Sequence, residues 1–215
     1  APLRASYADH EPARRLAVQP VHPIVGVLLA AGIGRRYDPS GERLKLLQVA
    51  PGHSAELPIA VAALRNLRAA VADVIAVVRP ADGEPQVALH RLLAAEGAQL
   101  VVCPEAAGGI GHSLACGVRA RGDAAGWVIA LADMPGVSPA TIAAVRDALA
   151  HGHPAVAPRH RGQRGHPVGF GRDCRAELLS LAGDAGARSV LANHPPLLID
   201  VDDPGCLLDI DTPAT

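Results

Sequence analysis

The chain has 215 residues, of which 49% are hydrophobic and only 2% aromatic, so one domain with a substantial aliphatic core is expected. The 20 Lys and Arg residues nearly balance the 21 Asp and Glu residues, and the net charge of −1 excludes a global basic field that would attract nucleic acid or an anionic membrane. Any anion-binding site must therefore be local.

The cysteines and the hydropathy pattern indicate where the protein works. The cysteines are scattered and form no C-x-x-C pair, which disfavours a zinc knuckle, a redox dithiol and a disulfide framework. No apolar run approaches the roughly 20 residues that a membrane span needs, and the chain does not start with the basic-then-apolar order of a signal peptide. We therefore predict a cytoplasmic protein with no membrane partner.

The elements follow one another in an alternating pattern. Residues 1–23, rich in Pro, Arg, His and Ala, are predicted to form an N-terminal extension before a domain of residues 24–215. Strands are predicted at 24–30, 73–80, 98–103, 126–132 and 197–202, with a two-stranded hairpin within 154–171. Helices are predicted at 58–71, 84–97, 112–120, 139–150, 175–182 and 187–193. This alternation predicts a three-layer, doubly wound α/β domain with a mostly parallel sheet.

The loop after the first strand begins like a nucleotide-binding motif. Gly32 and Gly34 match the start of a dinucleotide fingerprint, but Tyr37 stands where the third glycine is required. A phosphate loop fails at the same place, and its Lys-Ser/Thr pair is missing. What remains is a turn of small residues followed by four cationic side chains, Arg35, Arg36, Arg43 and Lys45. These groups suit a triphosphate, but a solvated basic loop explains them equally well.

Asp133 follows the most apolar strand, where a carboxylate is costly unless a cation compensates it. Mg²⁺ is a natural candidate, because it takes one or two protein carboxylates and completes its coordination with phosphate and water oxygens. Asp209 and Asp211 are candidates for the second carboxylate. The alternative is that Asp133 only caps the turn before Pro135.

Three further segments reach the same edge of the predicted sheet. The glycine-rich turn 108–113 leads into a helix and could close over a base or a phosphate, or be a plain loop. His166 could hydrogen-bond a substrate or hold its hairpin. Asp184 is a good candidate for a helix N-cap, and Arg188 could pair with it or face an anionic substrate.

The chain contains no H-E-x-x-H, G-x-S-x-G or nucleophilic Cys-His signature. This argues against a hydrolase with a covalent intermediate. The basic loop and Asp133 together favour a Mg²⁺-dependent enzyme that acts on a nucleoside triphosphate by in-line displacement, with catalysis by positioning and charge neutralisation.

Six motifs, in this order and spacing, resemble the MobA-like NTP transferase family and its molybdenum cofactor cytidylyltransferases: LLAAGIGRRYDPSGERLKLLQ, GGIGHSL, LADMPGV, RGHPVGF, GDAGAR and DIDTP. The similarity implies a Rossmann-like nucleotidyltransferase fold. It also implies transfer of CMP from CTP to a molybdopterin-type molybdenum cofactor, with release of pyrophosphate. Mg²⁺ would be the metal, with Mn²⁺ as an alternative. A molybdoenzyme or its maturation chaperone would be a further partner.

The resemblance also implies roles for individual residues, motif by motif. The catalytic residues would be Lys45, Arg36 and Asp133. The nucleotide would be bound by Leu29, Ala30, Ala31, Gly32, Gly34, Arg36, Lys45, Gly109, Gly111 and Ser113. The pterin substrate would lie near His166 and Arg188, and the metal would be held by Asp133 and Asp211.

The expected base preference depends on Ala31, because cytidylyl members typically read LAAG where guanylyl members read LAGG. The chain departs from the family pattern in a longer loop, which puts a phosphate contact of Arg43 in doubt, and in LADMP in place of LxDQP. The alternatives are a guanylyltransferase or another small-phosphate nucleotidyltransferase of the same fold. From a different class, a non-catalytic molybdenum cofactor carrier is the alternative.

Overall fold

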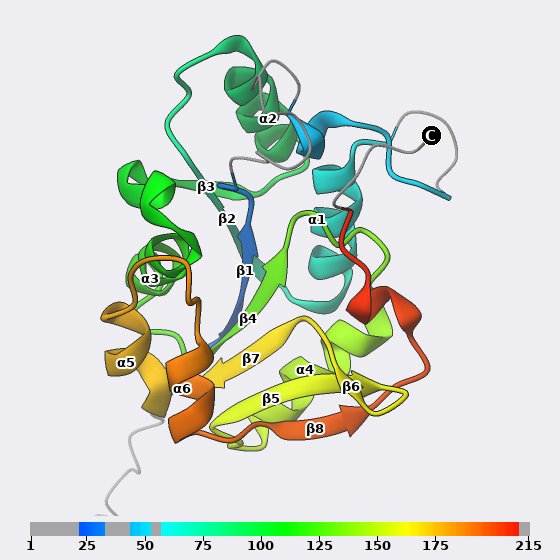
Figure 1. Ribbon diagram of the computed structural model, residues 1–215, viewed down its shortest axis with the longest axis vertical. Helices are drawn as coiled ribbons and strands as arrows, with labels where there is room; N and C mark the ends of the chain where they lie inside the picture. The colour runs from blue at the N-terminus through cyan, green and yellow to red at the C-terminus, as the bar shows by residue number, and fades with distance from the viewer. Residues whose placement is uncertain (1–21, 33–43, 53–56, 211–215) are drawn as a thin grey trace, which may run out of the picture.

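The computed structural model describes residues 22–32, 44–52 and 57–210, and these residues form one eight-stranded sheet with helices on both faces (Figure 1). The strands are β1 (Ile24–Leu29), β2 (Asp73–Val78), β3 (Gln99–Val102), β4 (Gly126–Leu131), β5 (Ala155–His160), β6 (Gln163–Arg164), β7 (Val168–Gly171) and β8 (Leu197–Asp200). The α-helices are α1 (Ile59–Ala70), α2 (Glu84–Ala95), α3 (Ile110–Ala120), α4 (Pro139–Ala150), α5 (Arg175–Leu179) and α6 (Arg188–Asn193). Shorter 3-10 helices are η1 (Lys45–Leu47), η2 (Pro104–Gly108), η3 (Arg172–Cys174) and η4 (Pro204–Leu207). The predicted extension 1–23 lies almost wholly outside the described residues and stays a prediction.

The sheet has the strand order β3-β2-β1-β4-β7-β5-β6, and β8 also pairs with β5. β1 lies parallel to both β2 and β4, and Leu29 is opposite Val77 on one side and Leu131 on the other. β7 is antiparallel to β4 and β5, whereas β8 is parallel to β5. The carboxyl ends of β1 and β4 therefore lie next to each other, which is where an open α/β sheet binds ligands.

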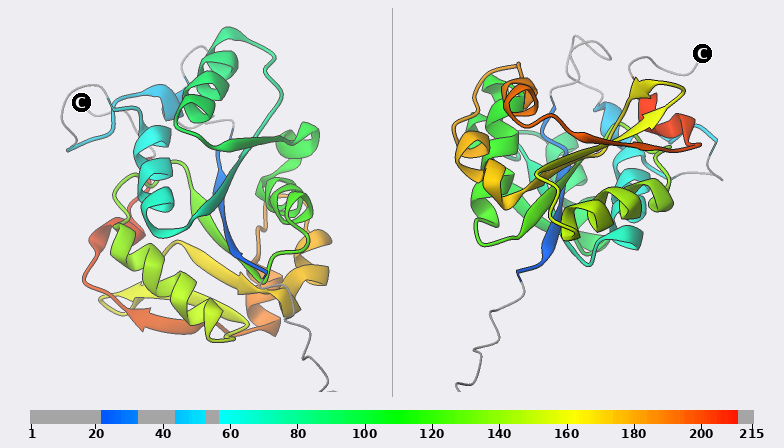
Figure 2. Two further views of the ribbon diagram at one scale, coloured as in Figure 1. Left: turned by 180° about the vertical axis from the view of Figure 1, so that it is seen from behind. Right: turned by 90° about the horizontal axis from the view of Figure 1, so that it is seen from below.

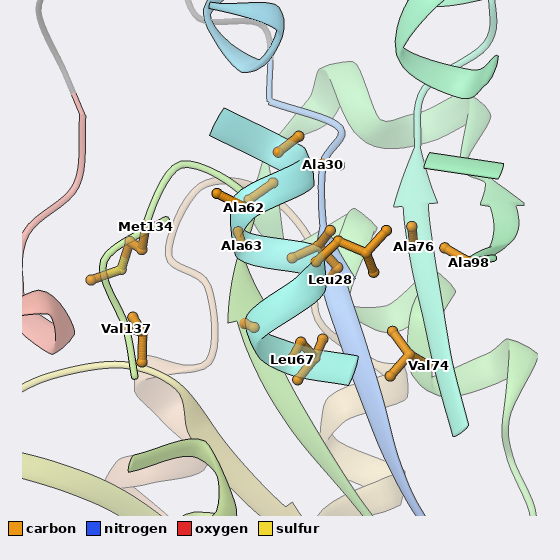
Figure 3. Close-up of a cluster of buried hydrophobic side chains, with 14 of the residues drawn as sticks. Leu28, Ala30, Ala62, Ala63, Leu67, Val74, Ala76, Ala98, Met134 and Val137 are labelled. Atoms are coloured by element: carbon orange, nitrogen blue, oxygen red, sulfur yellow. The ribbon is translucent and has the colours of Figure 1, made fainter. Parts of the chain in front are cut away.

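Alternate residues of the central strands face two different cores. Leu28 of β1 packs with α1, α2 and α4 on one side of the sheet, and Figure 3 shows it against Leu67 of α1 and beside β2. Val27 and Leu29 pack with α3, α5 and α6 on the other side, so Figure 2 shows helices on both faces. Because both faces are covered, the strands read as continuous apolar runs. The predicted three-layer, doubly wound arrangement is confirmed.

The element boundaries differ from the predictions where local turns intervene. The helix predicted at 112–120 begins at Ile110, and Gly109, with φ 122°, separates it from η2. The helix predicted at 175–182 ends at Leu179, because the Ser180 hydroxyl donates to the Glu177 carbonyl (2.7 Å) and competes with the helical pattern. The hairpin contains a third short strand, β6. No helix in the described part of the chain is long and apolar enough to cross a membrane.

Gly117 allows α3 to approach the sheet closely. A Cβ atom there would lie 2.6 Å from Val27 Cγ1 and 3.0 Å from Val77 Cγ2. We expect Gly117→Ala to lower the free energy of unfolding by about 1–3 kcal/mol in urea denaturation, because overpacking outweighs the better helix propensity of alanine. Gly83→Ala is the control for an added methyl group without overpacking: its Cβ would meet only Pro85 Cδ, at 3.8 Å, so its cost is limited to the weaker N-cap that alanine gives α2. A Gly117→Ala protein as stable as the wild type would contradict this packing.

Candidate active site

A cavity of about 380 Å³ lies at the carboxyl ends of β1 and β4, on the face that carries α3 and α6. Its apolar wall includes Leu29, Leu131, Phe170 and Leu191. Its polar groups are Arg164, His166, Asp184 and Arg188. The structure thus brings together the two residues predicted to contact the acceptor, His166 and Arg188. The cavity offers apolar surface to a ring and two guanidinium groups to an anion.

Lys45 and Asp133 form an ion pair at the end of β4, with 2.8 Å between Nζ and Oδ2. The Lys45 side chain is 9% exposed and that of Asp133 is 28% exposed. An ammonium group so deeply buried needs an anionic partner, which Asp133 provides. The Asn66 side-chain amide donates to the Pro135 carbonyl (2.9 Å), two residues after Asp133, and so connects α1 to the loop that carries Asp133. The fold therefore unites two predicted catalytic residues that are 88 positions apart.

His166 lines the cavity, and one of its ring nitrogens is buried. Its Nδ1 atom is buried and has no hydrogen-bond partner among the described residues. Burial lowers the pKa of His166 below its ordinary value of 6.5, the charge of Arg164 lowers it further, and the charges of Asp133 and Asp209 oppose this shift. The imidazole is therefore neutral near pH 7 and can exchange hydrogen bonds with a ligand without carrying charge.

The lowered pKa of His166 predicts a loss of stability at acid pH. Because the folded-state pKa lies below the unfolded value of 6.5, the unfolded chain binds more protons, and the free energy of unfolding falls as the pH drops below about 6.5 toward the folded-state pKa. His166→Asn removes this contribution and should flatten the decline. The measurement is urea denaturation between about pH 7.5 and about pH 5, with EDTA present. Equal slopes for the variant and the wild type would contradict the assignment.

The turn at Gly109 and Gly111 meets the loop before α6. The Gly111 N–H donates to the Gly183 carbonyl (2.9 Å), and a Cβ on Gly111 would lie 2.7 Å from the Ala182 carbonyl oxygen. A Cβ on Gly109 would collide with Gly183. Both glycines therefore let two backbones pack closely beside the cavity, a role that the sequence did not reveal. Ser113, also predicted to bind the nucleotide, is only 5% exposed; nucleotide contacts from this turn stay a prediction.

Asp184 does not cap α6, contrary to the sequence interpretation. The N-cap of α6 is Ala187, and no side chain caps the helix. The positive φ of Gly186, 58°, turns the chain between Asp184 and the helix. The Asp184 carboxylate approaches Gly109 and lines the cavity instead. Within the described residues, Asp184 and Arg188 form no ion pair.

The residues that follow β1 differ in exposure: Ala30 and Ala31 are buried, whereas Gly32 is exposed. Ala30 and Ala31 are 2% and 3% exposed, so their methyl groups face the interior. The Ala30 N–H donates to the Val77 carbonyl (2.9 Å), whereas the Ala31 and Gly32 N–H groups form no backbone hydrogen bond within the described part of the chain. A Cβ atom on Gly32 would meet no heavy atom of the described residues within 4 Å. The predicted site residues that fall outside the described ranges are Gly34, Arg36 and Asp211.

Asp133 supplies the kind of donor that a divalent cation needs. Mg²⁺ and Mn²⁺ prefer carboxylate oxygens, and one or two are enough when phosphate and water complete the coordination. The described residues contain no cluster of three or more His, Cys, Asp or Glu side chains suited to a metal. The Ile210 N–H donates to the Asp133 carbonyl (3.0 Å), which brings the chain to Asp133 one residue before Asp211. This donor set fits a cation that binds together with a nucleotide.

Asn66 and Phe170 contribute to the site although the sequence did not identify them. Asn66 reads as a polar surface position in a helix, and only the contact with Pro135 reveals its function. Phe170 is 1% exposed and lines the cavity. Phe170 is the single phenylalanine of the chain and follows His166 by four residues, which could have marked it as a candidate for the site.

The chain has the fold of the nucleotidyltransferases, with its candidate site at the carboxyl ends of the central strands. Rv0371c from Mycobacterium tuberculosis has a similar structure, with a TM-score of 0.72 and 28% identity over 89% of this chain and 94% of that chain. Its complex with manganese gives a TM-score of 0.64 and 26% identity over 90% of this chain and 91% of that chain. A nucleotidyl transferase from Methanothermobacter shares the fold, with a TM-score of 0.69 and 24% identity over 88% of this chain and 92% of that chain.

The chain belongs to the MobA-like NTP transferase family, whose domain model matches residues 26–197. The purine catabolism protein PucB of Bacillus subtilis is 31% identical over 202 residues, which are 88% of this chain and 92% of PucB. Family membership agrees with the expectation drawn from the six motifs. By its description, this family consists of NTP transferases.

Proposed function

We propose that this protein transfers CMP from CTP to a molybdopterin-type molybdenum cofactor and releases pyrophosphate. The observation that carries the transferase part is the Lys45–Asp133 ion pair, whose aspartate follows β4, the strand that lies parallel to β1. Membership of the MobA-like NTP transferase family supports this part. The choice of CTP depends on Ala31, and the choice of acceptor depends on the residues that line the cavity.

The triphosphate would lie across the end of β1. The N–H group of the exposed Gly32 and the ammonium of Lys45 would donate to its oxygens, with Arg36 as a further donor from the loop. Asp133 and Asp211 would hold Mg²⁺ or Mn²⁺, which supplies charge neutralisation on the phosphates when it is bound. The manganese complex of Rv0371c supports a divalent cation in a protein of this fold.

The acceptor would occupy the 380 Å³ cavity. Phe170 and Leu191 provide apolar contact for a ring system, while Arg164 and Arg188 attract a phosphate group. An oxygen of the acceptor phosphate attacks the α-phosphorus of CTP, the bond from that phosphorus to the bridging oxygen breaks, and pyrophosphate leaves with the bonding electrons. Because a phosphate oxygen is already ionised at neutral pH, the neutral His166 need only orient the acceptor.

CTP is proposed because Ala31 completes the LAAG motif that is typical of cytidylyl members, where guanylyl members read LAGG. Thermal unfolding with Mg²⁺ and either nucleotide tests this choice, since a ligand that binds only the folded state raises its apparent stability, by about 2.7 kcal/mol at 100 times its Kd. CTP should raise the Tm more than GTP at equal concentration. A larger shift with GTP would assign the guanylyl reaction instead.

The acceptor is tested by pyrophosphate release in a panel. The protein, Mg²⁺ and CTP are incubated with molybdenum-loaded molybdopterin, with metal-free molybdopterin and with simple sugar phosphates. Release should be fastest with molybdenum-loaded pterin, and the cytosine dinucleotide should appear in equal amount. Faster release with a sugar phosphate would assign another small-phosphate nucleotidyltransferase, an alternative that the same fold allows.

We also propose that the reaction takes place in the cytoplasm, with a molybdoenzyme or its maturation chaperone receiving the product. The cysteines of the described chain are all free, which suits a reducing compartment: Cys103, Cys116, Cys174 and Cys206. Purification from cells with the binding partner cross-linked, followed by mass spectrometry, tests the recipient. Recovery of only membrane or exported proteins would contradict this location.

A further inference from the structure

The segment 203–210, which we call the C-terminal strap, contacts both functional centres of the site through its backbone. The Cys206 carbonyl accepts a hydrogen bond from the His166 N–H (2.8 Å), and the Ile210 N–H donates to the Asp133 carbonyl (3.0 Å). Figure 1 shows the strap in red, running from η4 toward α1. The strap therefore connects the hairpin of the acceptor cavity with the loop of the Lys45–Asp133 pair.

Asp203 attaches the beginning of the strap to α4. Its Oδ2 atom accepts hydrogen bonds from the Ser138 N–H (2.9 Å) and from the Thr141 hydroxyl (2.6 Å). Its Oδ1 atom accepts the Gly205 N–H (3.0 Å) and so begins η4. Asp203 is only 8% exposed, and Thr141 3%. One buried carboxylate thus holds two chain segments whose positions differ by more than 60 residues.

Close backbone packing transmits this attachment to the site. A Cβ on Gly205 would collide with the Gly136 carbonyl, in the loop that follows Asp133. A Cβ on Gly165, the residue before His166, would collide with the Cys206 carbonyl. The strap is thus packed tightly against the loop that follows Asp133 and against the residue before His166. A displacement of the strap would therefore move both of these segments.

We infer that Asp203 is a positioning residue for nucleotidyl transfer: its carboxylate fixes the C-terminal strap on α4, and the strap sets the backbone positions of Asp133 and His166. This inference rests on the proposed function. Asp203 touches neither nucleotide nor acceptor in this arrangement. It acts by holding the nucleotide side of the site, at Asp133, and the acceptor side, at His166, at a fixed separation. A displacement of about 1 Å between reacting groups can lower the rate about 100-fold.

Asp203→Asn tests the inference with little change in side-chain volume. The amide oxygen can still accept from Ser138 and Thr141, but the amide NH₂ faces the Gly205 N–H. Residue 203 therefore stays on α4, while the strap beyond it loses the hydrogen bond that begins η4. We expect kcat to fall by about tenfold or more, while KM for CTP changes less than about threefold. Measurements are made well below the Tm of the variant.

Amide hydrogen exchange gives a readout that does not depend on activity. In Asp203→Asn, exchange at the N–H groups of His166 and Ile210 should accelerate, because their hydrogen bonds depend on the strap. Asp200→Asn is the matched control, since it removes only the exposed ion pair between Asp200 at the end of β8 and Arg159 of β5. It should leave both kcat and exchange unchanged.

The outcomes separate this inference from the proposed function. Unchanged kcat and unchanged exchange in Asp203→Asn would overturn the positioning role of Asp203. Faster exchange with unchanged kcat would also overturn it, because the strap would then be structural only. If the wild-type protein transfers no nucleotide to any acceptor, the proposed function fails, whereas the exchange experiment still decides whether Asp203 holds the strap. Thr141→Val, which removes one partner of the carboxylate, should give a smaller change in the same direction.

Discussion

Asp133→Asn is expected to lower kcat by about 1,000-fold, which corresponds to about 4 kcal/mol of barrier. The substitution keeps the size of the side chain but removes the charge that pairs with Lys45 and that would hold the divalent cation. The loss should appear mainly in kcat, because charge neutralisation matters most as the α-phosphate bond breaks. Steady-state pyrophosphate release at saturating Mg²⁺ and nucleotide is the measurement.

Asp147→Asn is the control for this variant, since Asp147 is 57% exposed on α4 and pairs only with its neighbour Arg146 in the described structure. It should retain the wild-type rate. A non-catalytic carrier would tolerate Asp133→Asn, so a variant that still delivers cofactor to a recipient enzyme at the wild-type rate would favour the carrier alternative. Circular dichroism should show that both variants are folded.

Lys45→Ala is expected to weaken nucleotide binding about tenfold to 100-fold and to lower kcat as well. The Lys45 side chain is 9% exposed, and charge-assisted bonds to phosphate are strong where water is largely excluded. Its removal also leaves the Asp133 carboxylate without this partner, so the Tm should fall. Calorimetric titration with CTP gives the dissociation constant, and pyrophosphate release gives kcat.

The double variant Lys45→Ala and Asp133→Asn examines whether the two side chains act as one unit. Residues in one ion pair do not contribute independently, so the combined loss of kcat should be smaller than the product of the single losses. Arg65→Ala, which removes an exposed ion pair with Glu96, should leave both binding and kcat unchanged. Full binding and turnover in Lys45→Ala would show that the site assignment is wrong.

The strands and helices that flank the site could be predicted because each has a hydrophobic pattern in its own stretch of sequence. β1 and β4 are continuous apolar runs, since helices cover both faces of the sheet. The antiparallel position of β7 between β4 and β5 could not be predicted, because strand order depends on pairings between distant residues. The early start of α3 depends on the backbone conformation of Gly109, which a sequence pattern does not specify.

The sequence pointed to the ionisable residues of the candidate site but not to the residues that hold them in place. Lys45 was identified within a basic loop, Asp133 because a carboxylate that follows an apolar strand is costly unless a cation compensates it, and His166 through the resemblance to the family. Their distances could not be known, and the ion pair of Lys45 with Asp133 emerges only from the fold. Asn66 and Asp203 act on backbone atoms of remote loops, and no local pattern marks such contacts.

The most direct test of nucleotidyl transfer follows the phosphates of CTP. The protein is incubated with Mg²⁺, molybdenum-loaded molybdopterin and CTP that carries a radioactive label on either the α- or the γ-phosphorus. We expect the α-label to appear on the acceptor and the γ-label to appear in pyrophosphate. Transfer of the γ-label to the acceptor, or no transfer of either label when nucleotide and acceptor are both bound, would contradict nucleotidyl transfer by this protein.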